Sequence, residues 1–540
     1  TVDIVRNIWI TFQVHSAVDF SSKMPPTDGK MVEKDTTHDA TDVSQGDSKT
    51  IRHRSHNGGG KDIAAHLADQ FANEPEYDRQ EEVKLRWKLD FRLIPFLWLN
   101  ITLPAMDKIT PSTGALYGMR EDLGLKGDQY AWVGSAFYFG YLLWCFPSSQ
   151  ILQRLPIAKS MCAVMIIWGF VLIGAGFCRS FIPMVITRVL LGALEAPVAP
   201  GNFIIMTMWY TREEQPIRAG LFYTGLATII TGTLGWAVGF LPTHAWPSFF
   251  YITGAISILY GALVGMFLPD NPVRAKFITP RERFVAIERL RAGQLGIENK
   301  TFSAPQLRET LRDPKTWLMF LFNIWVSIPN GGLTNFAPLI VNGLGYSPQR
   351  STLLMMPTGV VQTLSSFVCN FGVYVCVRRF RGCQLRGAFV IGGLVVGMVA
   401  TVLLYTLPLD NYTGRLWALY WSYFYLGPYI VALGINSANT AGHTKKVTTN
   451  AIVFAAYCIS NIIGPQFFKS SQAPLYPLGM GAMLVSYALS IFTMILYMLY
   501  CWNENRRREK LDQDAGQRFH LDTDFQDLTD RENIHFRYVW

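Results

Sequence analysis

Residues 181–201 read FIPMVITRVLLGALEAPVAPG, an apolar stretch long enough to cross a bilayer that nevertheless contains an arginine and a glutamate. Arg188 and Glu195 are seven residues apart, which is two turns of an α-helix, so both side chains project from the same face. A charge at the centre of a membrane costs about 2.5–3.5 kcal/mol on insertion scales, and such residues usually face a bundle interior or a water-filled cavity. The stretch therefore predicts a membrane protein of many helices with a polar interior.

A second charged pair, Asp107 and Lys108, interrupts the first long apolar stretch of the chain. Four ionisable groups inside such a bundle indicate a proton-coupled path for a charged solute. A buried carboxyl group that is poised between desolvation and a nearby cation can bind and release a proton. Glu195 and Asp107 are the candidates for this coupling. The alternative for each charge is a structural ion pair that ties the two apolar helices together.

The composition of the chain also fits a membrane protein. Half of the 540 residues are hydrophobic, the mean hydropathy is +0.19, and charged residues make up 16%, whereas soluble domains contain about 25%. The sequence predicts an all-α membrane protein with twelve transmembrane helices in two six-helix halves, because helices satisfy their own backbone polar groups. The expected spans of about 20 residues are 91–117, 129–149, 157–177, 181–203, 217–241, 248–268, 316–342, 351–373, 387–407, 416–436, 449–469 and 477–502.

Charged segments divide the chain into five parts. Residues 1–85 are polar and lack helical periodicity, which predicts a disordered cytoplasmic arm. Met24 and Met31 in this arm are candidates for the biological start, because the chain begins with Thr. The expected parts after the arm are the N-terminal half (86–269), a cytoplasmic connector (270–315), the C-terminal half (316–502) and a cytoplasmic tail (503–540).

The Lys and Arg residues of the loops predict the orientation. With the N-terminus inside, the short inner loops carry more of these residues than the outer loops, among them Lys159, Arg379 and Lys445. Both termini are therefore expected in the cytoplasm. The net charge of +9 follows from this topology and needs no nucleic-acid partner. Asn411 begins an N-glycosylation signal in an expected outer loop, whereas the equal match at Asn299 lies in the connector and should stay unmodified.

The second half contains no comparable interior charge, so polar amides are expected to line it. The candidates for substrate binding are Asn330, Asn335, Gln362 and Asn461. In the stretch PNGGLTN (329–335), the two glycines after Pro329 are expected to unwind the helix locally, which is tolerated only against a cavity. The alternative, at least for Gln362 and Asn461, is interhelical hydrogen bonding without a role in binding.

Several other classes of protein are disfavoured. The eight cysteines form no CxxC pair, and the nine histidines form no HExxH motif, so neither a metal site nor a disulfide framework is indicated. No nucleophile, base and orienting group occur together as an enzyme needs. The sequence therefore predicts a protein that is not an enzyme and uses no cofactor.

A resemblance to a known family rests on several motifs in order. They are MREDLGLKGDQYAWVGSAFYFGYLLW (119–144), RVLLGALEAPVAPGNFIIMTMWYTREEQPIRAG (188–220), FLPDNPVRAKF (267–277), PNGGLTNFAPLIV (329–341), NTAGHTKKVTTNA (439–451), YCISNIIGPQFF (457–468) and the ending FQDLTDRENIHFRYVW (525–540). The chain resembles the major facilitator superfamily, and within it the fungal allantoate permease branch of the anion:cation symporter family. The resemblance covers residues 83–540.

The resemblance implies secondary uptake of an organic anion together with protons. Substrates across the branch include allantoate, ureidosuccinate, nicotinate, pantothenate, biotin and small peptides. In the wider family, an acidic–basic pair in helix 1 and an Arg in helix 4, with a Glu seven residues later, serve proton coupling and carboxylate binding. Asp107-Lys108 and Arg188…Glu195 match this arrangement, with Lys108 in place of the more widespread Arg. Lys108 and Arg188 are thus the implied carboxylate ligands.

The expected partners are a small carboxylate, protons and the lipid bilayer, and the expected form is a monomer in the plasma membrane. Two alternatives stay open: a metabolite exporter, and a nutrient sensor that binds solute without transporting it. The stretch GTLGWAVGF (232–240) lacks the GPxxGG motif of antiporters, which favours uptake, and the short tail argues against a sensor. The tail itself is expected to pack or to bind trafficking partners.

Overall fold

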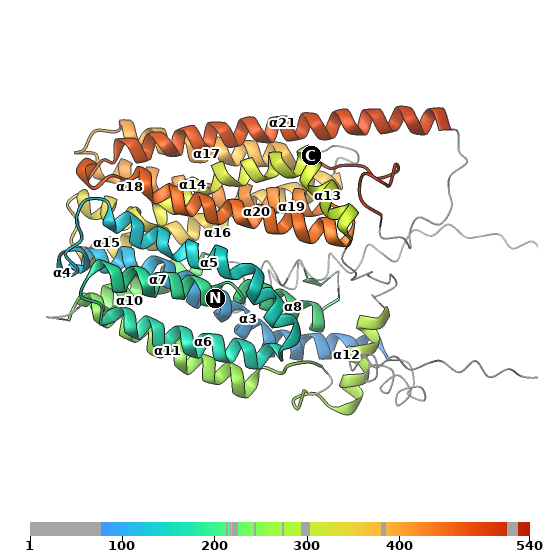
Figure 1. Ribbon diagram of the computed structural model, residues 1–540, viewed down its shortest axis with the longest axis horizontal. Coiled ribbons are helices and arrows are strands. Elements are labelled where there is room, and N and C mark those ends of the chain that lie inside the picture. The colour runs from blue at the N-terminus through green and yellow to red at the C-terminus, as the bar shows by residue number, and fades with distance from the viewer. Residues whose placement is uncertain are drawn as a thin grey trace, which may run out of the picture. The chain divides into compact units, whose positions relative to one another are not determined.

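A computed structural model describes residues 77–540 except 212–213, 216–217, 219–224, 242–244, 273–274, 293–302, 380–384 and 516–527. The described residues form helices joined by turns, with no strand among them. The long helices run side by side (Figure 1). Met24, Met31 and Asn299 lie outside the described residues.

The helices of the described residues follow the all-α plan expected from the sequence, in which two halves of transmembrane helices are joined by a connector. The first half contains α3 (Arg79–Leu116), α4 (Met119–Asp122), α5 (Gln129–Arg154), α6 (Ile157–Gly176), α7 (Phe181–Glu195), α8 (Val198–Trp209), α10 (Leu226–Val238) and α11 (Ala245–Phe267). The connector contains α12 (Pro280–Ala292) and α13 (Ala304–Arg312). The second half contains α14 (Pro314–Gly343), α15 (Pro348–Leu354), α16 (Met356–Arg379), α17 (Arg386–Thr406), α18 (Tyr412–Ser422), α19 (Leu426–Ala438), α20 (His443–Ile463) and α21 (Pro477–Ala515).

Every predicted span coincides with a helical segment, although the helices differ in polarity. Within the described residues, eight segments are long and apolar enough to cross a membrane by length and composition alone. Of the other four, α10 is short, whereas α3, α5 and α14 have more polar sequences. The buried polar residues of α3 and α14 include Asp107 and Asn335. Lower hydropathy in these helices reflects the polar interior that they line.

Two expected boundaries are wrong by several residues. Helix α3 begins at Arg79, inside the arm that was expected to be disordered up to residue 85. The carboxylate of Glu81 accepts a hydrogen bond from the backbone N–H of Asp78 and forms an ion pair with Arg281 of α12. Because that partner lies some two hundred residues away, the polar start of α3 looked like part of the arm. Helix α21 likewise continues to Ala515, past the expected end of the second half.

Helices α5 and α7 approach each other closely through two glycines. A Cβ atom at Gly140 would lie 1.8 Å from the carbonyl oxygen of Val189, and one at Gly192 would lie 1.8 Å from that of Phe137. Only glycine allows this approach, as in other membrane helix pairs with small residues at the interface. The contact fixes the face of α7 that carries Arg188 and Glu195, because Gly192 lies between them.

The two halves close against each other at one end of the bundle. Short helices α4 and α15 mark this end, and α12 and α13 lie at the opposite end (Figure 1). At the α4 end, Lys469 pairs with Asp128 at 2.8 Å and Gln349 donates to the carbonyl of Gly239 at 2.9 Å. Closer to the middle, the Tyr130 hydroxyl donates to the backbone carbonyl of Asn335 at 2.7 Å. These contacts separate the middle of the bundle from the α4 end.

Candidate functional site

Two buried ion pairs join α3 to α7 in the bundle interior. The guanidinium of Arg188 lies 3.2 Å from the Asp107 carboxylate, and the ammonium of Lys108 lies 2.5 Å from the Glu195 carboxylate. Asp107 and Arg188 are each 1% exposed, whereas the Lys108 side chain is 21% exposed. The four charges predicted from the sequence therefore lie together. Each acidic residue pairs with a base on the other helix, and the neighbours Asp107 and Lys108 do not neutralise each other.

Pro111 explains part of the arrangement around Arg188. A proline inside a helix has no N–H, so the carbonyl four residues before it loses its helical partner. For Pro111 this carbonyl belongs to Asp107, and it accepts a hydrogen bond from Arg188 at 3.4 Å. Arg188 thus contacts both the backbone and the side chain of Asp107. The kink-forming proline supplies a second acceptor for the guanidinium.

Glu195 is the last residue of α7, where the fourth transmembrane helix is interrupted. Pro197 has no backbone N–H, and α8 resumes at Val198. One carboxylate oxygen of Glu195 binds Lys108, while the other accepts no hydrogen bond from the described residues. A buried carboxylate with one unsatisfied oxygen is a good proton acceptor, because protonation removes much of its desolvation cost.

Aromatic rings surround both cations. The Lys108 ammonium lies 5.7 Å from the ring centre of Phe137 and 5.9 Å from that of Tyr141, both on α5. The Arg188 guanidinium lies 5.4 Å from the ring centre of Phe250 on α11. Cation–π contacts of this length stabilise a charge where water is scarce. The rings allow the cations to stay charged if a carboxylate exchanges its partner.

Asn330 and Asn461 form an amide cluster in the second half. The side-chain amide of Asn330 donates to Asn461 at 2.8 Å and accepts from the Tyr425 hydroxyl at 2.7 Å. It also contacts the Tyr457 hydroxyl at 3.4 Å. The cluster therefore contains two tyrosine hydroxyls as well as the two amides. The nearby stretch 329–335 stays helical within α14 and does not unwind.

Two further tyrosines, which the sequence did not single out, lie between the charged residues and the amide cluster. Tyr138 on α5 and Tyr457 on α20 pack against each other with their ring centres 6.0 Å apart. Tyr138 lines the same small cavity as Lys108 and Arg188, and the Tyr457 hydroxyl lies 3.4 Å from the amide of Asn330. No spacing pattern marks them, because each depends on a partner in the other half. They link the two halves at the site.

The remaining candidates lie in different places. Asn335 shares a small cavity with Lys108 and Arg188, and its amide donates to the carbonyl of Gly331 at 2.8 Å. Gln362 on α16 is half-buried and makes no hydrogen bond with the described residues. Asn411 is exposed at the start of α18, where its side chain accepts from the N–H of Gly414 at 2.9 Å. The structure brings Asn335 to the charged site and leaves Gln362 and Asn411 apart from it.

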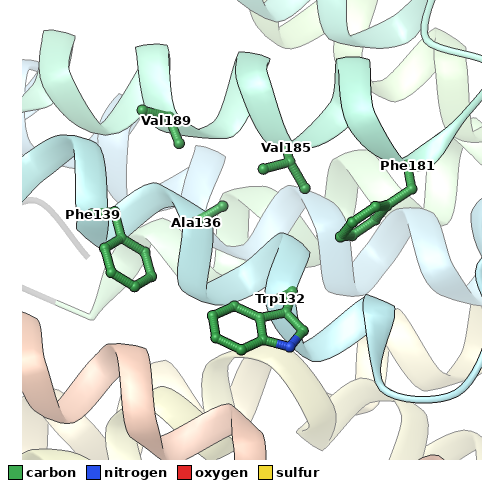
Figure 2. Close-up of a pocket in the computed structure, with 6 residues that line it drawn as sticks. All are labelled: Trp132, Ala136, Phe139, Phe181, Val185 and Val189. Atoms are coloured by element: carbon green, nitrogen blue, oxygen red, sulfur yellow. The ribbon is translucent and has the colours of Figure 1, made fainter.

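The cavity beside Lys108 and Arg188 is small in this conformation. Its volume is about 10 Å³, room for roughly one water molecule. A larger hollow of about 400 Å³ lies between α5 and α7 and has an almost wholly apolar lining (Figure 2). Trp132 and Phe139, which line this hollow, are 46% and 40% exposed, as expected of side chains that face lipid. The polar residues, not the larger hollow, mark the candidate site.

Comparison with known proteins identifies the family. The family model described as Major Facilitator Superfamily matches residues 97–465. The chain belongs to the Major Facilitator Superfamily. It is a multi-pass membrane transporter of small molecules and not an enzyme, as expected from its sequence.

The relatives within the superfamily include several fungal proteins. The chain is 35% identical to the allantoate permease of Saccharomyces cerevisiae, over 88% of this chain and 90% of that protein. It is 36% identical to the MFS-type transporter cnsL of Penicillium expansum, over 88% and 93%, and 30% identical to the thiamine pathway transporter THI73 of S. cerevisiae, over 85% and 86%. These similarities confirm the resemblance to the fungal allantoate permease branch.

Solved structures agree on the fold. A bacterial homologue of the human lysosomal transporter Spinster, in an inward-facing and unoccupied conformation, superposes with a TM-score of 0.58 at 17% identity, over 78% of this chain and 97% of that one. A D-xylose–proton symporter superposes with a TM-score of 0.55 at 12% identity, over 75% and 97%. At these identities the match concerns the fold alone.

Proposed function

We propose that this superfamily member takes up a small organic anion, a carboxylate, together with protons. The observation that carries the proposal is the pair of buried ion pairs between α3 and α7. A substrate carboxylate can replace Glu195 at the Lys108 ammonium once Glu195 is protonated, since the cation then keeps an anionic partner. Substrate binding and proton binding would thereby depend on each other. The relatedness to an allantoate permease supports a carboxylate substrate.

The contacts of the second half complement this exchange. Asn330, Asn461 and Tyr457 offer amide and hydroxyl groups from the second half, next to the contact between the rings of Tyr138 and Tyr457. A solute bound at Lys108 could reach these groups only from between the halves, where the transporters of this fold bind their substrates. Because the cavity at Lys108 has room for only about one water molecule, the halves must separate to admit the solute.

Uptake of labelled carboxylates by cells that express the chain tests the proposal. We expect accumulation of at least one acid, with a rate that rises as the outside becomes more acidic and a gradient that a protonophore abolishes. The uncharged amide of the same acid should not accumulate, because a buried cation without an anion to pair with is costly. Equal uptake of acid and amide, or uptake indifferent to the proton gradient, would contradict the proposal.

The orientation, with both termini in the cytoplasm of a plasma-membrane protein, is part of the same proposal. It predicts a glycan on Asn411, since the loop before α18 would face the lumen during synthesis, and none on Asn299. The side-chain nitrogen that would carry the glycan is not the atom that caps α18, because the cap uses the oxygen. Glycosidase treatment of the wild type, Asn411→Gln and Asn299→Gln would be compared by electrophoretic mobility. A glycan on Asn299 would invert the topology.

A further inference from the structure

The end of the chain, residues 528–540, lies against the second half at the end opposite α4. It contacts α13, the start of α14, the turn between α19 and α20, and α21. Thr529, Asp530 and Tyr538 are each at most 1% exposed. A segment that buries its polar side chains in this way is part of the packed structure and is not a free tail. We call it the clasp.

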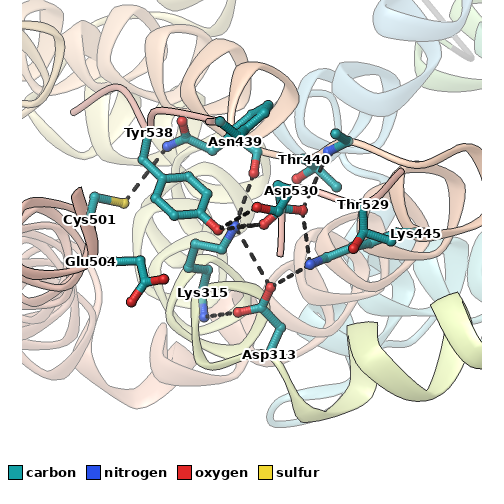
Figure 3. A network of polar contacts seen from close by, with 12 residues as sticks. Asp313, Lys315, Asn439, Thr440, Lys445, Cys501, Glu504, Thr529, Asp530 and Tyr538 are labelled. Carbon is teal, nitrogen blue, oxygen red and sulfur yellow. Dashed lines mark hydrogen bonds and ion pairs between the residues drawn. The ribbon is translucent and has the colours of Figure 1, made fainter. Parts of the chain in front are cut away.

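Asp530 is the centre of a buried charge cluster (Figure 3). Its carboxylate lies 2.5 Å from the ammonium of Lys315 and 2.9 Å from that of Lys445. Lys445 also pairs with Asp313 at 2.8 Å and with Glu309 at 2.7 Å, whereas Lys315 is 3.7 Å from Asp313. Asp530 is therefore the one carboxylate within hydrogen-bond distance of Lys315 among the described residues.

Burial alone would raise the pKa of Asp530, but the ammonium groups of Lys315 and Lys445 and their hydrogen bonds lower it to about 2. The carboxylate thus stays ionised at any physiological pH. Burial would lower the pKa of Lys445, but Asp313 and Asp530 raise it, so that pair stays charged; burial lowers the pKa of Lys315. This behaviour suits a structural element and would not suit a pH sensor.

Side-chain amides of the bundle bind the backbone of the clasp, as the backbone of a neighbouring strand would. Asn505 on α21 donates to the carbonyl of Tyr538 at 2.9 Å and accepts from its N–H at 2.9 Å. Asn439, in the turn after α19, does the same for Val539 at 2.7 and 2.8 Å. The Tyr538 hydroxyl donates to Asp530 at 2.7 Å. Each amide satisfies both backbone groups of one residue, which requires a defined position of the segment.

The first half contains a matching arrangement with other residues. Arg289 of α12, in the segment that follows the sixth helix, contacts Glu214 at 3.3 Å and the carbonyl of Trp209 at 2.6 Å. Glu214 lies between the fourth and fifth helices, and Lys445 lies in the first turn of α20, directly after the corresponding loop of the second half. In the same loop Arg218 binds Asp90 of α3 at 2.8 and 3.0 Å. Each half thus has a segment after its last helix that pairs with its middle loop.

We propose that the cytoplasmic-end face of the second half is a binding site for the chain's own C-terminal segment, and that transport requires residues 528–540 to be seated there. At this end of the bundle, the clasp contacts the first helix of that half, the turn between its fourth and fifth helices, and its sixth helix. Alternating access moves one half against the other as largely rigid bodies. A half whose helices separate at one end would lose that rigidity.

Hydrogen exchange of the full-length protein tests whether the segment is seated and does not depend on the substrate. In the wild type, the C-terminal peptide should be protected at Tyr538 and Val539, whose N–H groups bind amides of the bundle. Asp530→Asn should speed this exchange by roughly a hundredfold and lower the unfolding temperature, because one partner of a buried pair is lost. Glu509→Gln, which neutralises an exposed acid on α21, is the matched control and should change neither.

The double variant Lys315→Met with Asp530→Asn separates ion pairing from general damage. Removal of both partners should lower the unfolding temperature less than removal of Asp530 alone, because Lys315 is no longer left buried without its carboxylate. Transport by Asp530→Asn should show a lower maximal rate at an unchanged half-saturation concentration, since the substrate site is distant. Three results would overturn the proposal. One is fast hydrogen exchange of the segment in the wild type, and another is a loss of stability in the double variant that equals the sum of the two single losses. The third is unchanged transport by an Asp530→Asn protein whose segment is no longer seated.

Discussion

Glu195→Gln is expected to abolish proton-driven accumulation while solute exchange across the membrane continues. Glutamine has the size and shape of protonated glutamic acid and can also form hydrogen bonds. Unlike glutamic acid, it cannot release a proton. Lys108 loses its 2.5 Å ion pair and becomes permanently available to a substrate carboxylate. The carrier should therefore still bind and reorient with solute. The variant should still take up solute down the solute's own concentration gradient. Uptake should stop when the concentrations inside and outside are equal, with no accumulation above that level.

The measurement compares net accumulation with counterflow in vesicles preloaded with unlabelled solute. Glu121→Gln is a suitable control, because Glu121 is an exposed acid on α4 and its neutralisation should leave both rates unchanged. Normal accumulation by Glu195→Gln with a normal pH profile would remove Glu195 from the coupling role. Loss of counterflow together with accumulation, in a protein that still folds, would assign Glu195 to solute binding instead.

Much of the fold could be predicted because a bilayer imposes a simple length rule on helices. Apolar stretches of about 20 residues set the twelve expected spans, and each one contains a helix within the described residues. Boundaries were wrong where polar residues pair with distant ones. The start of α3 depends on Arg281, and the polar end of α21 packs against Tyr538 through Arg508 and Asn505. Such partners are invisible to any local pattern.

In the candidate site, too, local sequence features could be predicted and contacts between distant residues could not. Charges inside apolar stretches are conspicuous, so all four members of the ion pairs could be found from the sequence. Their pairing could not, because it depends on which face of α3 meets α7. Tyr138 and Tyr457 could not be found either, since a tyrosine in a membrane helix is ordinary until its ring meets one from the other half. Gln362 shows the opposite case, a conspicuous amide that the structure leaves outside the cluster.

Arg188→Ala is expected to have an effect at least as large as that of Glu195→Gln, through binding and through folding together. Both members of the Asp107–Arg188 pair are 1% exposed, and loss of one partner of a buried ion pair costs about 3–5 kcal/mol. The freed carbonyl of Asp107 also loses its donor. Alanine at this position should therefore lower both the amount of folded carrier and the transport of the anion. Arg188→Lys keeps the charge and should recover folding better than transport.

The paired variant Asp107→Asn with Arg188→Gln decides what the arginine does. If Arg188 only balances the buried Asp107, neutralising both removes the unpaired charge and should restore folding and transport together. If Arg188 also attracts the substrate carboxylate, folding should recover while transport of the acid stays low and the preference for acid over amide disappears. Melting temperature in detergent reports the first property, and the ratio of acid to amide uptake reports the second. Recovery of both would leave Lys108 as the remaining candidate for anion binding, because its ammonium is the other cation of the paired charges.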